Sequence, residues 1–228
     1  MADSKSEKEE IETFLERLTD KYEYLRGKME VLKFIDNPPT ENDRKTINDF
    51  NVFFIMIRSA LITDIIINLH NVYQHGDGYG LPKFLNKVSS NWPLFDAKNE
   101  KRLREIAEGD KKGLDVVEEI LEKVRTIRNK DRAHYDKIYF LNPELLQKDA
   151  PLSMEELDKL MIPYQQIIWN YRLLLLGRDY SPGIPELLTQ IRFLVERLQV
   201  YEEMVKDRSS YEVLDKMLAI IRQRQPEA

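Results

Sequence analysis

A short basic stretch of the chain carries the residue types best suited to phosphate chemistry. Residues 127–137 include Arg128, followed directly by Asn129, and His134, which is one of three histidines in the sequence. An arginine side chain presents a planar fork of donors to phosphate oxygens, and a neutral imidazole can exchange a proton near neutral pH. These two groups together could bind a phosphate and move protons without a metal ion.

The spacing of the two groups suggests how such a site would be assembled. Arg128 and His134 lie six positions apart. In an unbroken α-helix, six positions rotate a side chain by roughly 240°, so the two would not share a face. One chain could therefore hold only half of a site.

The same stretch also has a purely structural interpretation. Asp131 and Asp136 lie near lysine and arginine neighbours, as on an exposed helix laced with salt bridges, and Ala133 could face inward. Basic residues nevertheless outnumber acidic ones over residues 122–137. The basic ones are Lys123, Arg125, Arg128, Lys130, Arg132 and Lys137, against Glu122, Asp131 and Asp136. A polyanion site here would be focal.

Two segments of the sequence resemble one family. The order Arg-Asn-Lys at 128–130 and Ala-His-x-Asp-Lys at 133–137 resembles the Arg-(four to six residues)-His signature of the HEPN superfamily, and its abortive-infection U-type branch in particular. A long apolar helix, a polar loop at residues 74–80 and Leu-Pro-Lys-Phe-Leu at 81–85 are similar to the same branch. We estimate that the resemblance covers residues 50–176.

The resemblance implies an all-α, HEPN-like helical bundle and, for many members, a metal-independent RNase that works as a homodimer. Two copies of the motif would then face one another across a two-fold axis. On this basis His134 would activate an RNA 2′-hydroxyl against the adjacent phosphate, and Arg128 would stabilise the charge on the phosphate oxygens. The product would be a 2′,3′-cyclic phosphate. The implied partners are RNA, a second copy and an antitoxin or regulatory protein.

Further candidates surround these two residues. Asn129 could bind RNA or orient the motif. Many HEPN RNases carry a tyrosine two residues after the histidine, whereas here Tyr135 follows directly and Asp136 takes the second position. Because of this departure, a non-catalytic dimer that binds a protein or a nucleotide is the alternative hypothesis. Three basic residues are candidates for RNA binding: Lys130, Arg132 and Lys137.

Composition narrows the class of protein. A net charge of −5 over 228 residues argues against nucleic-acid binding over the whole surface. The chain has no cysteine, which excludes disulfides, thiolate metal sites and a cysteine nucleophile. His70 and His75 lack a metal-ligand spacing, so we expect them to cap helices or bond within loops, and we expect no metal and no cofactor. The polar first ten residues lack the apolar core of a signal peptide, and we expect a cytoplasmic protein.

Periodicity predicts helices along almost the whole chain, which we divide into residues 1–39, 40–177 and 178–228. The first segment is an amphipathic helix that ends before Pro38 and packs on the core. Thr40 caps a second helix that contains the apolar residues 50–69. This helix is long enough to span a membrane, but Arg58 and Asp64 near its middle favour a core helix that is buried on several sides. Asp64 could be a buried polar site near the motif, or it could pair with Arg58 or with another basic group.

The rest of the chain supplies the elements that would position the motif. We expect a charged helix at about residues 96–107, a glycine-containing connection at 109–113, and a helix that ends at Ile127 and delivers Arg128. Ser153 and Glu156 predict a capping box, and Pro163 should kink or restart the helix that follows. Glycines and prolines at 177–185 mark a boundary before two further helical stretches, which we interpret as packing or oligomerisation surface.

Overall fold

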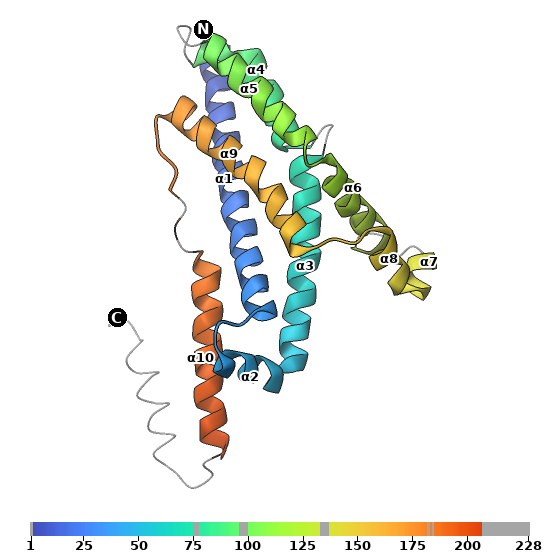
Figure 1. Cartoon of the computed structure of the whole chain (residues 1–228). Helices are drawn as coiled ribbons and strands as arrows, with labels where there is room; N and C mark the ends of the chain where they lie inside the picture. Colours follow the sequence, from blue (N-terminus) through green and yellow to red (C-terminus); the bar gives the residue numbers. More distant parts are fainter. Residues whose placement is uncertain are drawn as a thin grey trace, which may run out of the picture.

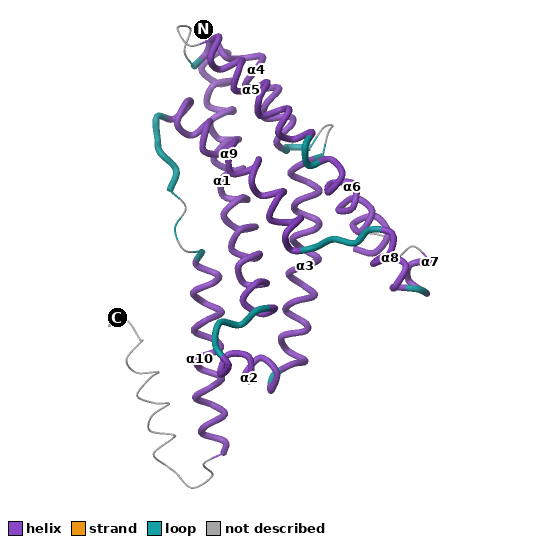
Figure 2. Tube along the Cα trace, viewed as in Figure 1, coloured by secondary structure: helices purple, strands orange, loops and turns teal. Residues whose placement is uncertain are grey.

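A computed structural model describes residues 2–74, 78–95, 100–132, 137–181, 183 and 185–206. Within these ranges every regular element is a helix (Figures 1 and 2). The predicted all-α fold is therefore confirmed. The α-helices are α1 (Ala2–Asp36), α2 (Glu41–Asp49), α3 (Asn51–Tyr73), α4 (Leu81–Asn91), α5 (Glu100–Asp115), α6 (Glu118–Ile127), α7 (Lys137–Leu141), α8 (Pro143–Asp149), α9 (Met154–Leu176) and α10 (Glu186–Lys206). Two short helices complete the list, the 3₁₀ helix η1 (Trp92–Leu94) and the π-helix η2 (Arg128–Arg132).

The long helix α1 forms the centre of the bundle. It contacts α3, α4, α9 and α10, and Figure 1 shows α9 crossing it while α3 runs alongside. Its predicted apolar stripe is almost fully buried: Ile11, Leu15, Leu18, Tyr22, Leu25, Met29 and Leu32. Burying one such side chain contributes about 1.5–3 kcal/mol, so this stripe supplies much of the free energy that stabilises the fold.

Buried tyrosines connect the central helices through hydrogen bonds. The Tyr164 hydroxyl on α9 donates to the Leu18 carbonyl of α1 at 2.6 Å. The Tyr73 hydroxyl at the end of α3 donates to the Leu160 carbonyl of α9. A buried hydroxyl needs such a partner, because burying it without one costs about 1–3 kcal/mol. These bonds fix the register of α1, α3 and α9.

Helix ends that depend on local sequence lie where the sequence predicts. α1 ends at Asp36, before the two prolines, and the Thr40 side chain accepts from the Asp43 backbone N–H at 3.0 Å. The capping box of α9 is complete, because Ser153 accepts from the Glu156 N–H and the Glu156 carboxylate accepts from the Ser153 N–H. α9 closes at Gly177, whose φ of 61° is the left-handed conformation that glycine adopts most easily.

Two predicted boundaries are wrong, and one of the two alternatives predicted for Pro163 is excluded. The segment after Thr40 is two helices, because the chain turns at Phe50. Residues 109–113 belong to α5, which continues to Asp115 because Leu103, Ala107 and Leu114 are buried along one face. α9 does not restart at Pro163; it continues through the proline, with Leu160 and Tyr164 held in the core on either side.

α3 is buried on one side only, which corrects the expectation of a helix buried on several sides. Only 22% of its most apolar stretch is buried, and Val52 and Met56 are 69% and 67% exposed. The helix is long and apolar enough to cross a membrane, but a single helix of this kind is weak evidence for a membrane protein. Both of its charged residues pair with α1: Arg58 with Asp36 at 2.7 Å, and Asp64 with Lys28. Of the alternatives for Asp64, the structure shows pairing with another basic group, Lys28, and not with Arg58; the Asp64 side chain is 45% exposed, so it is not a buried polar site.

A second, smaller core joins the other end of α1 to the C-terminal part of the chain. It contains residues of α1, α2, α3 and α10: Val31, Phe34, Ile35, Ile47, Phe54, Leu188, Ile191 and Val195. α10 accordingly lies beside α1 and α2 in Figure 1. The second C-terminal helix expected from the sequence lies in residues 207–228, outside the described residues.

Candidate functional site

The motif begins where α6 ends, as predicted. α6 buries Leu121, Val124 and Ile127, and Arg128 follows directly as the first residue of η2. η2 has the wider turn of a π-helix, a form that occurs mostly in single turns and often at functional sites. The buried face of α6 thus anchors the backbone from which Arg128 projects.

Arg128 differs from its basic neighbours in its hydrogen-bond and ion-pair partners. Arg125, one turn earlier, forms ion pairs with Glu118 at 2.6 Å and Glu122 at 2.5 Å. Lys123 pairs with Glu156 at 2.5 Å. The half-buried Arg128 instead donates to the neutral Asn129 amide oxygen at 2.8 Å, and no carboxylate in the described part of the chain pairs with it. Its positive charge is therefore available to an anion.

His70, which we expected to cap a helix or to bond within a loop, contacts its neighbour Asn71, with 3.4 Å between the His70 Nδ1 and the Asn71 Oδ1. His70 lies in the last turn of α3, a helix that contacts both α6 and η2. The pKa of the His70 imidazole is lowered, mainly by burial. The contact with the Asn71 side chain raises this pKa, whereas the positive charges of Arg128 and Arg125 lower it further. His70 thus lies within the electrostatic reach of Arg128. Sequence spacing gave no sign of this, because the two residues are 58 positions apart.

The other predicted site residues are described to different extents. Asn129 is exposed and accepts the Arg128 hydrogen bond. Lys130 and the Arg132 backbone belong to η2, and Lys137 is exposed at the start of α7. Three predicted residues, His134, Tyr135 and Asp136, lie outside the described residues. The approach of Arg128 to His134 therefore stays a prediction.

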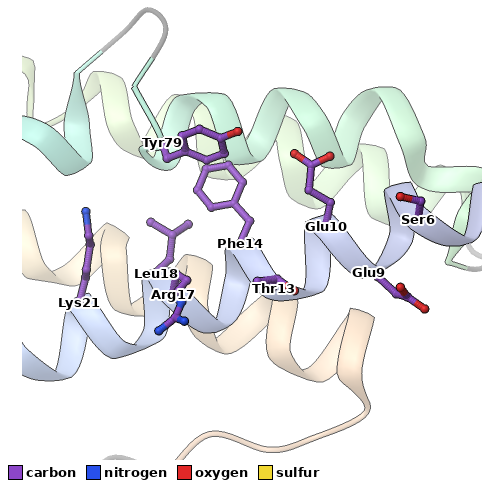
Figure 3. A pocket seen from close by; sticks show the side chains of 9 residues that line it. All are labelled: Ser6, Glu9, Glu10, Thr13, Phe14, Arg17, Leu18, Lys21 and Tyr79. Atoms are coloured by element: carbon purple, nitrogen blue, oxygen red, sulfur yellow. The ribbon is translucent and has the colours of Figure 1, made fainter. Parts of the chain in front are cut away.

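Other parts of the molecule offer less to a phosphate. A cavity of about 440 Å³ lies along α1, where Tyr79 packs edge-on against Phe14 with ring centroids 5.1 Å apart (Figure 3). Its charged lining mixes both signs: Glu9, Glu10, Arg17 and Lys21. Carboxylates at the rim would repel a phosphate backbone. Within the described ranges no group of three histidine, aspartate or glutamate side chains could hold a metal ion. The end of α6 is therefore the candidate site.

The helical bundle and the Arg128–His134 motif together define a HEPN-type protein. A model of the AbiU2 family of HEPN domains matches residues 8–188, and the chain belongs to this family. The match begins in α1 and ends in α10, so it is wider than the resemblance we estimated from the motifs. No curated protein and no solved structure matches the chain.

Proposed function

We propose that this protein is a metal-independent endoribonuclease of phage-defence or toxin type, which cuts RNA at a site formed by Arg128 and His134 in a homodimer. The observation that carries the proposal is the Arg128 guanidinium, which has an amide but no described carboxylate beside it while Arg125 is doubly paired. Membership of a HEPN family named for abortive infection suggests the same activity.

The chemistry needs one cation and groups that transfer protons. His134 takes the proton of the RNA 2′-hydroxyl, and the resulting oxygen attacks the adjacent phosphorus. The bond to the 5′-oxygen then breaks, and this oxygen gains a proton from the His134 of the second copy and leaves as a 5′-hydroxyl, while the other product carries a 2′,3′-cyclic phosphate. Arg128 binds the non-bridging oxygens and stabilises the charge that builds on them; removing a preorganised donor of this kind typically costs about 10²–10³ in kcat. Asn129, Tyr135 and Asp136 would orient these groups.

The homodimer is supported by the apolar face of α3. We define this face by Val52, Met56, Ser59, Thr63 and Ile67, which follow one another at spacings of three or four. Val52, Met56 and Ser59 are exposed, and Figure 1 shows the first half of α3 at the edge of the bundle. A second copy is the occupant that we propose. Because α3 also contacts η2, pairing through this face would bring two motifs toward the two-fold axis.

RNA contact would be confined to the region of the motif. The net charge of −5 disfavours binding over the whole surface, so the basic residues that flank the site would hold the RNA backbone: Lys130, Arg132 and Lys137. An antitoxin or regulatory partner would restrain the enzyme. One observation favours the alternative of a non-catalytic binding dimer: Asp136 occupies the position where many HEPN RNases carry tyrosine.

RNA cleavage in the presence of EDTA tests the proposal. Native protein, Arg128→Ala and His134→Ala are incubated with total tRNA and with an RNA of mixed sequence. Arg44→Ala is the matched control, because Arg44 is exposed on α2 and pairs loosely with Glu41 at 3.8 Å. We expect chelator-resistant cutting by the native and Arg44→Ala proteins, and loss of cutting in the other two. A folded native dimer that leaves both RNAs intact would favour the binding module.

A further inference from the structure

The short helix α7 carries exposed apolar side chains to which the proposed function gives no role. It spans Lys137–Leu141, and its Ile138 and Leu141 side chains are 60% and 63% exposed. Figure 1 shows α7 at the outer edge of the bundle, next to α8. A helix of five residues has little stability of its own, because most helical stability in proteins comes from packing. α7 would therefore be stabilised by an apolar surface that covers these two side chains.

A groove along the middle of α3 is such a surface. Its volume is about 510 Å³, and pockets of roughly 300–1,000 Å³ hold small organic molecules, so the groove has room for a few aliphatic side chains. Six residues of α3 line it: Met56, Ser59, Ala60, Thr63, Asp64 and Ile67. Because Ser59, Ala60 and Thr63 are small, another helix can come close to α3 here. The Thr63 hydroxyl already donates to the Ser59 carbonyl at 2.9 Å, so it needs no partner in the groove.

The carboxylate of Asp64 at this groove can still accept a hydrogen bond. Its Oδ2 accepts from the Lys28 ammonium and from the Asn68 amide, the latter at 2.8 Å. Its Oδ1 accepts no hydrogen bond from the residues that the structure describes. A carboxylate can accept about four hydrogen bonds, so Oδ1 is able to bind a further cation. The groove thus suits a segment with aliphatic side chains next to a positive charge.

α7 has this combination of side chains. Ile138 and Leu141 are three positions apart, and Lys137 and Leu141 are four apart, so the three lie on one side of the helix. Lys137 is exposed, and within the described ranges no carboxylate forms an ion pair with it. Its charge and the two apolar side chains therefore complement the carboxylate and the apolar lining of the α3 groove.

The position of η2 explains how a second copy could bring the two surfaces together. η2 contacts both α3 and α7 in one chain. A two-fold axis near η2 would bring α7 of one copy toward α3 of the other, and the symmetry would form the same contact twice. Arg128 belongs to η2, so the Arg128 residues of both copies would then lie near the axis.

We propose that α7 of one copy binds in the α3 groove of the second copy, with Ile138 and Leu141 on the apolar lining and Lys137 at the Asp64 carboxylate. This inference rests on the homodimer of the proposed function, and it names the element that covers the α3 face. An ammonium group has three donors, so Lys137 can pair with Asp64 and still contact RNA. Because α7 begins where the motif segment ends, its exchange holds both motifs at the interface.

Engineered cysteines test this contact directly, because the chain has no cysteine of its own. Ser59→Cys places a thiol in the groove, and Leu141→Cys places one on α7. A disulfide needs Cα atoms within about 7 Å of each other, so it forms only if these positions meet. Under mild oxidation we expect the double variant to run at twice the monomer mass on a non-reducing gel. Each single variant should stay unlinked.

The matched control combines Ser59→Cys with Val116→Cys. Val116 is exposed between α5 and α6, at the end of α6 remote from the motif, and this pair should stay unlinked. Linking of Ser59→Cys alone would show that α3 packs against α3, and it would overturn the role of α7. A native dimer whose Ser59→Cys, Leu141→Cys variant stays unlinked would overturn it too.

Assembly of charged variants provides a second measurement without cysteines. We expect Leu141→Glu to raise the dissociation constant of the dimer about 100-fold and Lys137→Glu about tenfold, because each puts a carboxylate against the groove. The controls Val116→Glu and Lys101→Glu should leave it unchanged, since Lys101 is exposed on α5 and pairs loosely with Glu105 at 3.9 Å. Equal thermal unfolding midpoints exclude misfolding as the cause. An unchanged dissociation constant in both test variants would refute the contact.

These experiments distinguish failure of this inference from failure of the proposed function. If the double cysteine variant links specifically while native protein leaves RNA intact in EDTA, the α7 contact stands and the RNase proposal fails. If native dimer cuts RNA, the double variant stays unlinked and Leu141→Glu remains dimeric, the RNase proposal stands and the α7 contact is refuted. A monomeric native protein refutes the contact together with the homodimer.

Discussion

Arg128 and Arg125 have the same side chain one turn apart, yet they have different partners among the described residues. The two carboxylates beside Arg125 make it part of the surface ion pairs of α6, a kind of interaction that contributes little to stability. Arg128 lacks such a partner among the described residues, and its charge adds to the effect of burial in lowering the pKa of His70. For these two arginines, the ion-pair partners thus indicate which side chain could bind an anion, whereas the residue type alone does not.

The lowered pKa of His70 also predicts how stability depends on pH. Below pH 6.5, the ordinary pKa of histidine, the unfolded chain binds more protons at this position than the folded protein, so stability falls as the pH falls through the folded pKa. In His70→Gln this contribution is absent. We expect urea unfolding at pH 7.5, 6.5 and 5.5 to show a shallower decline for His70→Gln than for native protein.

Other titrating groups do not obscure this comparison. The pKa of Glu156 is lowered by its hydrogen bond to Lys123 and by the Ser153 backbone N–H, so its contribution is lost only at still lower pH, and equally in both proteins. Parallel declines for the two proteins between pH 7.5 and 5.5 would contradict the account of His70.

The sequence predicted the position of Arg128 at the end of a helix but not the surroundings of His70, for a physical reason. Arg128 was predictable because the apolar period of residues 117–127 carries a helix to its end, and the motif begins at the next residue. After burial, the arginines of α6 and η2 help to lower the pKa of His70 because α3 packs on these two helices, a contact between distant segments that periodicity does not report. The residues next to His70 in the sequence indicate only the polar end of a helix.

At the scale of elements, features fixed by neighbouring residues were predictable and features fixed by packing were not. The Thr40 cap and the capping box at Ser153 depend on side chains three residues apart. By contrast, the continuation of α5 through Gly109 and of α9 through Pro163 opposes local preference. A glycine inside a helix costs about 1 kcal/mol and a proline about 3 kcal/mol relative to alanine. Buried contacts on the core side of each helix outweigh this cost.

The glycine inside α5 leads to a prediction about stability. A Cβ added at the exposed Gly109 would meet no atom within 4 Å, so alanine fits there without strain. We expect Gly109→Ala to raise the free energy of unfolding by about 0.5–1 kcal/mol, because alanine loses less conformational freedom in a helix. Chemical denaturation measures the change.

Gly27 on α1 is the matched comparison for this substitution. A Cβ there would lie 3.1 Å from the Leu187 Cδ1, so the same change to alanine should gain less or destabilise the protein. A destabilised Gly109→Ala would show that α5 does not run through residue 109 in solution.

At the scale of the whole molecule, the predicted class of protein was correct, but the extent of the family domain was underestimated. The all-α fold and the HEPN relationship followed from helical periodicity and a few motifs, and both are confirmed. The family match also includes most of α1, whose buried stripe is the centre of the core. A repeating apolar stripe is common to many helical proteins, so the stripe of α1 did not indicate one particular family.

The apolar face of α3 predicts that assembly is sensitive to a single charge. Burying an unpaired carboxylate in an interface is strongly unfavourable, so we expect Met56→Glu to convert a dimer into a monomer. Light scattering coupled to gel filtration measures the mass. Ile162→Glu is the matched control, because Ile162 is 61% exposed on α9 and lies outside the proposed interface. A monomeric native protein, or a dimer unaffected by Met56→Glu, would contradict this interface.

The most direct test of the central claim is the chemical nature of the RNA ends that native protein produces in EDTA. Attack by the 2′-hydroxyl, with Arg128 and His134 as the acting groups, predicts a 2′,3′-cyclic phosphate on one fragment and a 5′-hydroxyl on the other. Mass spectrometry of the fragments distinguishes these ends from a 3′-hydroxyl and a 5′-phosphate, which water-mediated cleavage would leave. Cyclic phosphate that disappears in Arg128→Ala and His134→Ala would support the account, whereas 5′-phosphate ends, or cyclic phosphate retained in both variants, would contradict it.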